Sequence, residues 1–147
     1  AMSADRPSDT EIRHASCVAL SGRAVLITGA SGSGKSALAL GLMTRGAGLI
    51  SDDRTILTRQ GSDIVASCPE PIRGLIEARG VGLLNATPHP PASVCLVVDL
   101  DRTEAERFPP HRDVTILAIS LPLINKVESS HFIDAVLLYL SGGRSFR

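Results

Sequence analysis

The chain has 147 residues, 44% of them hydrophobic and 20% charged, and its 15 basic and 15 acidic side chains give a formal net charge of zero. This length suffices for one domain with one core. The lack of any basic block argues against a nucleic-acid partner, which needs positive charge opposite its phosphates. No apolar run approaches the roughly 20 residues of a membrane span and no signal peptide is recognisable. The sequence therefore predicts a cytoplasmic protein with neither a nucleic acid nor a membrane as partner.

The N-terminal half predicts short strands, two hairpins and one helix. Residues 1–13 are polar and are predicted to be a flexible segment. Ser21-Gly22-Arg23 and residues 59–62 each separate two apolar runs, as hairpin turns do. Good helix formers over residues 37–43 precede Arg45-Gly46, a basic last turn followed by glycine, and predict a helix. The predicted strands are residues 17–20, 24–28, 49–50, 55–58, 63–66 and 81–84.

The C-terminal half predicts two buried strands and a helix. Residues 94–100 are a continuous apolar run, which is typical of a strand buried on both faces, and residues 114–121 predict another. The proline-rich segment at 87–91 predicts a rigid connector. Apolar residues at helical spacing predict a helix over residues 131–140. The three cysteines, Cys17, Cys68 and Cys95, lack metal-type spacing and predict reduced, mostly buried thiols. The fold class predicted is α/β, with a mixed sheet, several hairpins and few helices.

The segment GASGSGKS follows the apolar run AVLIT and matches G-x-x-x-x-G-K-[ST] at every position. Glycines let backbone N–H groups converge on phosphate oxygens, and the following helix directs its N-terminus at the same anion. Lys35 supplies a mobile charge for the β- and γ-phosphates, and Ser36 offers a hydroxyl to Mg²⁺. The segment predicts a phosphate-binding loop for ATP. Its residues are Gly29, Ala30, Ser31, Gly32, Ser33, Gly34, Lys35 and Ser36.

A dinucleotide-binding fingerprint is the alternative interpretation of this segment. Gly32-x-Gly34-x-x-Ala37 fits its looser form, and Asp52 lies near the position of a ribose-binding acid. A lysine followed by a serine in the first helical turn, as at Lys35-Ser36, is however typical of a phosphate loop. The single tyrosine, Tyr139, also lacks a lysine four residues later, which short-chain dehydrogenases carry. A phosphate loop is therefore favoured.

Two strand ends offer acids for Mg²⁺ or for general base catalysis. Asp99 ends the apolar run 94–98 and resembles an ordinary Walker B acid, whereas Asp52-Asp53 follow the strand at Leu49-Ile50. Adjacent residues on an extended strand point in opposite directions. One carboxylate of the pair can thus address a metal and the other an acceptor hydroxyl. From the residues alone, a solvated turn at Asp52-Asp53 stays open as well.

From His14 onward the chain reads HASCVALSGRAVLITGASGSGKSALALGLMTRGAGLISDD and then LIEARGVGLL. This run resembles the catalytic domain of bacterial HPr kinase/phosphorylase. That family has a histidine before the first strand of a hairpin, then I-T-G-x-S-G-x-G-K-S, A-D-D and L-E-I-R-G-x-G-I-I. The spacing is kept without a gap from His14 to Asp53, and the match becomes patchy after residue 85. The resemblance implies a P-loop kinase domain over residues 14–147.

The resemblance also implies roles for individual residues. Asp52 matches the acid that takes the proton from the target serine hydroxyl, and His14 matches a histidine near the transferred phosphate. Asp53 and Glu77, together with Ser36, match the metal shell. The remaining matches are two arginines: Arg79, in the E-x-R-G motif, and Arg107, a loop arginine near the phosphate.

The function predicted is ATP- and Mg²⁺-dependent phosphorylation of a serine on the phosphocarrier HPr. Two properties of the family stay open as hypotheses, because they depend on later regions that are shortened here. These are phosphorolysis of phosphoseryl-HPr with inorganic phosphate and assembly into a homo-oligomer, which is a hexamer in the family. Two other functions remain: a small-molecule kinase with Asp99 as its Walker B acid, and a non-enzymatic nucleotide-sensing module.

Overall fold

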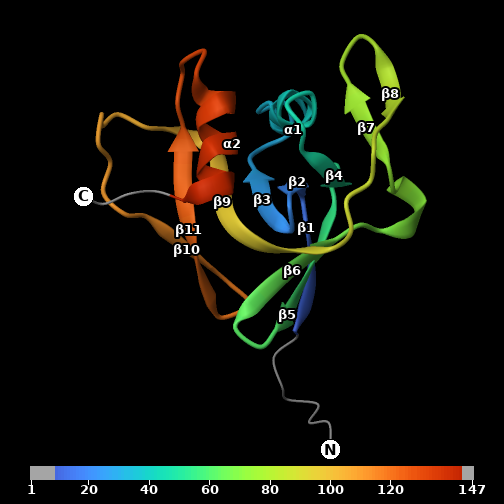
Figure 1. Ribbon diagram of the computed structural model, residues 1–147, viewed down its shortest axis with the longest axis horizontal. Coiled ribbons are helices and arrows are strands. Elements are labelled where there is room, and N and C mark those ends of the chain that lie inside the picture. The colour runs from blue at the N-terminus through green and yellow to red at the C-terminus, as the bar shows by residue number, and fades with distance from the viewer. Residues whose placement is uncertain (1–8, 144–147) are drawn as a thin grey trace, which may run out of the picture.

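The computed structural model describes residues 9–143, which form eleven strands, two α-helices and a 3₁₀ turn at Glu70–Ile72 (Figure 1). The strands up to the middle of the chain are β1 Thr10–Arg13, β2 Ala15–Leu20, β3 Arg23–Thr28, β4 Gly48–Ser51, β5 Thr55–Gln60 and β6 Asp63–Ser67. The later strands are β7 Leu75–Ala78, β8 Gly82–Asn85, β9 Ala92–Thr103, β10 Asp113–Ile116 and β11 Ile119–Lys126. The helices are α1 Lys35–Met43 and α2 Phe132–Gly142.

Nine of the strands form one mixed sheet around β9. Its main path runs β1-β5-β6-β9-β3-β2-β4, and the β10–β11 hairpin joins through β11. One edge of β9 pairs in parallel with β3. Strand β6 pairs with β9 near its start, at Ala92 and Ser93, and β11 pairs with it in parallel from Val97 onward. Because β9 continues past β6, the sheet branches and curls around it. The β7–β8 hairpin is a separate small sheet.

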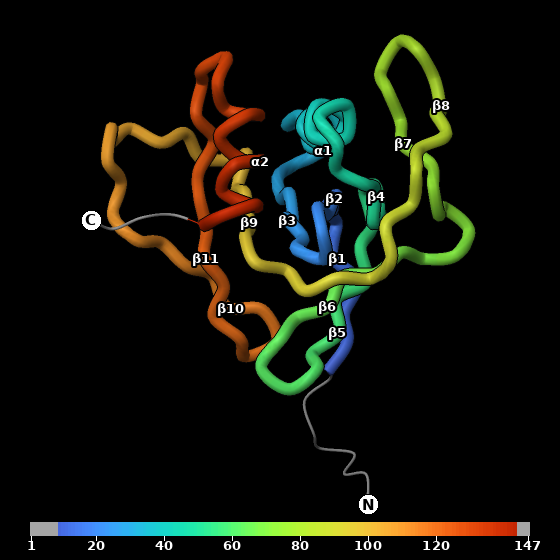
Figure 2. Tube along the Cα trace, in the orientation of Figure 1, coloured from blue at the N-terminus to red at the C-terminus, as the bar shows by residue number. Residues whose placement is uncertain are grey.

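Two apolar cores lie on the two faces of this curled sheet. Strand β3 alternates between them, since Leu26 joins one core while Val25 and Ile27 join the other. The first core fills the inside of the curl with residues such as Leu57. The second lies between the sheet and the two helices, where it includes Leu42 of α1 and several residues of α2. Figure 2 shows α1 and α2 on the same side of β9 and β3, with the β7–β8 hairpin standing beside α1.

The predicted α/β class, with a mixed sheet, several hairpins and few helices, is confirmed. The β2–β3 and β5–β6 hairpins form around their predicted turns. Strand β9 and helix α1 extend the predicted ranges by two or three residues at an end, and α2 begins one residue later and ends two residues later than predicted. Neither helix within residues 9–143 is long and apolar enough to cross a membrane. The three cysteines are free thiols, and burial raises the pKa of Cys17 and of Cys95.

Two predicted elements differ in the structure. The predicted flexible segment 1–13 is wrong for residues 10–13, because β1 pairs antiparallel with β5, from Thr10 opposite Thr58 to Arg13 opposite Thr55; residues 1–8 lie outside the described part. The predicted single strand at 114–121 is a hairpin whose turn residues, Leu117 and Ala118, have φ of 49° and 66°. Nothing in an apolar Leu-Ala pair indicates a turn, since glycine and asparagine usually fill such positions.

Candidate active site

The predicted phosphate loop connects β3 to α1 and leaves the N-terminus of that helix without a side-chain cap. Gly34 precedes the helix with φ of 103°, a left-handed conformation that favours glycine, and no side chain caps the helix. A Cβ on Gly29 would collide with Ser33 Oγ, so the start of the loop also requires glycine. No side-chain hydrogen bond caps the first N–H groups of α1, so these groups can donate to a phosphate oxygen.

Lys35 lies folded back over this loop. Its side chain is buried, and Nζ donates to the carbonyl oxygens of Gly29 at 2.9 Å and Ala30 at 3.1 Å. These carbonyl groups satisfy the ammonium group where it is buried. The lysine is thus held at the loop, with its charge adjacent to the open helix N-terminus.

Asp52 is buried beside the first turn of α1. Its Oδ1 accepts hydrogen bonds from Ser36 Oγ at 2.7 Å and Ser16 Oγ at 2.8 Å. Its Oδ2 accepts the backbone N–H of Glu77 at 3.1 Å. The residue is only 8% exposed, so three donors satisfy a nearly inaccessible carboxylate. Asp52 therefore connects the phosphate loop, β2 and β7.

Asp53 points away from Asp52 into a more open environment. Its side chain is 62% exposed, and its Oδ1 lies 2.5 Å from Nε2 of His14, which precedes β2. The two carboxylates do not lie on an extended strand, as the expectation assumed, but in a turn after β4 in which Asp53 has φ of 68°. They nevertheless contact different partners. One contacts the serine of the phosphate loop and the other contacts a histidine at the surface.

The β7–β8 hairpin closes the other side of the site. Ile76 anchors β7 in the second core, and the neighbouring Glu77 and Arg79 are exposed. The Nη2 atom of Arg79 lies 3.7 Å from the place that a Cβ on Gly32 would occupy, so it reaches the phosphate loop. A cavity of about 490 Å³ lies between the loop, the aspartate pair and this hairpin. Its lining includes Lys35, Ser36, Asp52, Asp53, Glu77 and Arg79.

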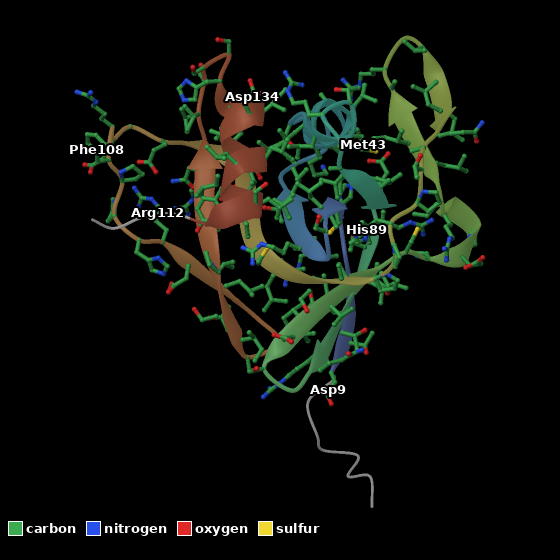
Figure 3. The ribbon with its side chains drawn as sticks, in the orientation of Figure 1. Asp9, Met43, His89, Phe108, Arg112 and Asp134 are labelled. Carbon is green, nitrogen blue, oxygen red and sulfur yellow. The ribbon has the colours of Figure 1, made fainter. Side chains whose placement is uncertain are left out.

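Two predicted site residues lie elsewhere. Asp99 accepts the backbone N–H of Asp101 at 2.8 Å and lies 3.9 Å from Arg102, and it does not line the cavity that contains Ser36. Arg107 lies in the loop after β9, stacked 5.2 Å from the centre of the Phe108 ring, and lines a different cavity between this loop, β11 and α2. Figure 3 places Phe108 at the opposite side of the molecule from the β7–β8 hairpin. The loop between β9 and β10 thus keeps Arg107 away from the phosphate loop.

The donors in the cavity fit a magnesium ion bound together with a nucleotide. Ser36, Asp52, Asp53 and Glu77 all offer oxygen, the ligand that Mg²⁺ prefers. Within residues 9–143 no three His, Cys, Asp or Glu side chains form a group that could hold a metal ion by themselves. Mg²⁺ in nucleotide sites takes most of its ligands from phosphates and water and needs only one or two carboxylates.

Sequence reasoning missed two residues of this region. Ser16 is fully buried and contacts both aspartates of the pair; a serine inside the apolar strand ASCVAL was the available signal. Asp101 accepts the backbone N–H of Ala30 with both oxygens, at 3.0 and 3.1 Å, and so holds the start of the phosphate loop. An acid two residues beyond Asp99 carries no motif, so only the fold reveals it.

Comparison with known proteins bears on this arrangement. The family model described as HPr Serine kinase C-terminal domain matches residues 6–89, more than half of the chain. The chain belongs to this family. The HPr kinase/phosphorylase of Aromatoleum aromaticum is 36% identical over 119 residues, which are 72% of this chain and 38% of that protein. The HPr kinase/phosphorylase of Acidovorax sp. is 46% identical over 79 residues, 53% of this chain and 25% of that protein.

The match extends to a solved structure. The HPr(Ser) kinase/phosphatase from Coxiella burnetii is 25% identical, with a TM-score of 0.75 over 89% of this chain and 94% of that one. This similarity confirms the fold beyond residue 89, where the family model ends. The aligned regions span only about a quarter to two fifths of the two sequence relatives.

Proposed function

We propose that this chain is an ATP-dependent protein kinase domain that transfers a phosphoryl group to a serine of the phosphocarrier HPr. The observation that carries the proposal is that one cavity contains the phosphate loop, the Asp52-Asp53 pair and Arg79. A phosphoryl-transfer site needs such a combination of an anion cradle, metal ligands and an acceptor-side base. The named relatives, HPr kinase/phosphorylases, support HPr as the acceptor.

The phosphate side of the site consists of the loop, Lys35 and Arg79. The N–H groups at the start of α1 bind phosphate oxygens, and Lys35 moves its ammonium group from the loop carbonyls to the β- and γ-phosphates. Arg79 contributes a second positive charge from the β7–β8 hairpin. Charge stabilisation of this kind supplies most of the catalysis in phosphoryl transfer.

Ser36 and Glu77 would hold Mg²⁺, which would neutralise negative charge on the phosphates of ATP. Asp52 orients Ser36, because the Ser36 hydroxyl donates its proton to Asp52 Oδ1 and so keeps its lone pairs free for the metal. The backbone N–H of Glu77 donates to Asp52 Oδ2, so the same carboxylate also positions Glu77, the second of the two metal ligands we propose. Three donors and burial leave Asp52 little access to an acceptor hydroxyl.

The geometry thus favours exchanging the two roles that the resemblance implies for the aspartate pair. We assign Asp53 as the general base, since it is exposed to the cavity and contacts His14. In the transfer step, the serine oxygen of HPr forms a bond to the γ-phosphorus while the bond from this phosphorus to the bridging oxygen breaks, and ADP leaves. The proton of the serine hydroxyl goes to Asp53, with His14 orienting the carboxylate.

The reverse reaction uses the same groups. Asp53 takes a proton from inorganic phosphate, a phosphate oxygen bonds to the phosphorus of phosphoseryl-HPr while the bond from that phosphorus to the serine oxygen breaks, and Asp53 passes the proton to the serine oxygen as pyrophosphate leaves. Arg107 takes no part in either direction within one chain, because it lines another cavity.

The test is to incubate the purified protein with HPr, Mg²⁺ and γ-labelled ATP, and to map the labelled residue. Labelled serine on HPr supports the proposal. Labelling of small metabolites without HPr would favour the small-molecule kinase, and ATP binding without any transfer would favour the sensing module. Release of pyrophosphate from phosphoseryl-HPr and inorganic phosphate tests the reverse direction.

A further inference from the structure

Ser16 is a buried polar residue in a strand that is otherwise apolar. Strand β2 reads ASCVAL, its first five residues are buried, and Ser16 is fully enclosed. A buried hydroxyl is tolerated when it is hydrogen-bonded. Its bonds therefore indicate why a serine occupies a place where an alanine or valine would suit the core.

The hydroxyl of Ser16 bridges the two aspartates. Its Oγ donates to Asp52 Oδ1 at 2.8 Å and accepts the backbone N–H of Asp53 at 3.1 Å. A serine hydroxyl has one donor and two acceptor positions, so it can make both bonds at once. One buried atom thus contacts the side chain of the first carboxylate residue and the main chain of the second.

The hydrogen bond from the Asp53 backbone N–H to Ser16 lies at a residue with an unusual backbone conformation. Asp53 has φ of 68°, in the left-handed region, which residues with a Cβ seldom adopt. The turn is further defined by the backbone N–H of Arg54, which donates to the Asp52 carbonyl at 2.8 Å. In this conformation the Asp53 carboxylate meets His14 instead of facing Ser36. Strain at a functional turn persists only where the surroundings fix it.

We propose that Ser16 is a positioning residue for both carboxylates. Through Asp52 it fixes the oxygen that receives the Ser36 hydroxyl, and through the Asp53 N–H it holds the turn that directs Asp53 to the acceptor side. The inference rests on the proposed function for its catalytic part. Its metal-binding part does not depend on the identity of the acceptor.

The test compares Ser16→Ala with a matched control, Thr55→Val. Thr55 is also fully buried, and its hydroxyl donates to the Ala15 carbonyl at 2.9 Å without contacting either aspartate. Both variants lose one buried hydroxyl next to the same strand, and thermal unfolding monitors their stability. The first readout is the Mg²⁺ concentration that half-saturates binding of a non-hydrolysable ATP analogue, measured without HPr. The second is kcat and KM for transfer to HPr.

Ser16→Ala is expected to raise the half-saturating Mg²⁺ concentration and to lower kcat, each by about 10-fold or more, with KM for HPr nearly unchanged. A tenfold change corresponds to about 1.4 kcal/mol, close to the lower end of the range for a hydrogen bond to a charged group. Thr55→Val is expected to leave both readouts near those of the unchanged protein. At saturating Mg²⁺, which removes the effect through Asp52, Ser16→Ala should lower kcat little further in the Asp53→Asn background, because Ser16 then acts only on the proton transfer through Asp53.

Wild-type Mg²⁺ dependence and kcat in Ser16→Ala would overturn the inference. So would equal losses in Thr55→Val, or an undiminished loss of kcat in the Asp53→Asn background, since these are the signs of a general effect on the core. If the unchanged protein binds Mg²⁺ and the ATP analogue but does not phosphorylate HPr, the proposed function fails. The Mg²⁺ readout then still decides whether Ser16 positions Asp52.

Discussion

Replacing each aspartate of the pair by asparagine separates their roles. Asp53→Asn keeps the shape of the side chain and tolerates a positive φ, because asparagine is among the residues that adopt it most readily. It removes the basicity of a carboxylate that is exposed to the cavity and contacts His14. We expect transfer to HPr to fall by about 10²–10⁴-fold, the range for losing a general base. Binding of Mg²⁺ and ATP should change little.

Asp52→Asn is expected to act on metal binding. The carboxylate accepts three hydrogen bonds, one of them from the Glu77 backbone N–H, which cannot rotate away. An asparagine amide has a single oxygen, which can face either the two serine hydroxyls or the Glu77 N–H. A buried donor on the other side then has no acceptor. Such a group costs about 1–3 kcal/mol. At about 1.4 kcal/mol per decade, the half-saturating Mg²⁺ concentration should rise by roughly 5- to 150-fold.

Single-turnover transfer of label from ATP to HPr, at saturating Mg²⁺, measures the chemical step. Calorimetric titration with an ATP analogue at several Mg²⁺ concentrations measures binding. The reasoning is refuted if Asp53→Asn transfers at nearly the wild-type rate while Asp52→Asn loses transfer with unchanged Mg²⁺ dependence. That outcome would restore the role of base to Asp52, as the resemblance alone implies.

Three further predictions concern other parts of the molecule. Lys35→Met should lower transfer by about 10²-fold or more, because one cation at the phosphates is lost, while the circular dichroism spectrum stays unchanged. Arg112 holds the pKa of Glu104 below its ordinary value of 4.5, so the stabilisation is complete above that value and is lost as the pH falls further. In urea unfolding, the advantage of the unchanged protein over Glu104→Gln should therefore shrink below pH 4.5. Ala118→Gly should raise the free energy of unfolding by about 0.5–1 kcal/mol, because glycine relieves the left-handed conformation at φ of 66° more than it adds chain entropy.

The sequence was sufficient to predict those elements whose conformation depends on residues close together in the chain. The β2–β3 turn at Ser21-Gly22 and the loop ending in Lys35-Ser36 are specified by residues within a few positions of each other. The resemblance then linked these local signals to Glu77 and Arg79, which do line the same cavity. Motif spacing was informative here because each motif lies at the end of a strand or at a hairpin tip.

Features that depend on distant partners were not predictable in this way. Strand β1 is mostly polar, so its composition alone resembles a flexible segment. Its pairing with β5, from Arg13 opposite Thr55 to Thr10 opposite Thr58, is what stabilises it. The different contacts of Asp52 and Asp53, from which we propose their roles, involve the hydroxyl of Ser16, 36 residues before Asp52. Arg107 follows an arginine of the family only by loose alignment, and the loop after β9 directs it to another cavity.

The two parallel pairings of β9 determine the order in which the chain can fold. Hairpins such as β2–β3 close over a few residues, whereas Thr28 of β3 and Val98 of β9, which share a hydrogen bond, are 70 residues apart in sequence. The entropy of closing so long a segment must be overcome before its contacts form, and such non-local pairing slows folding. The phosphate loop begins directly after Thr28, and Asp101 at the end of β9 holds its second residue. The loop from Gly29 to Ser36 should therefore reach its final conformation in the slow phase of folding, when β9 docks, and not when the early hairpins form.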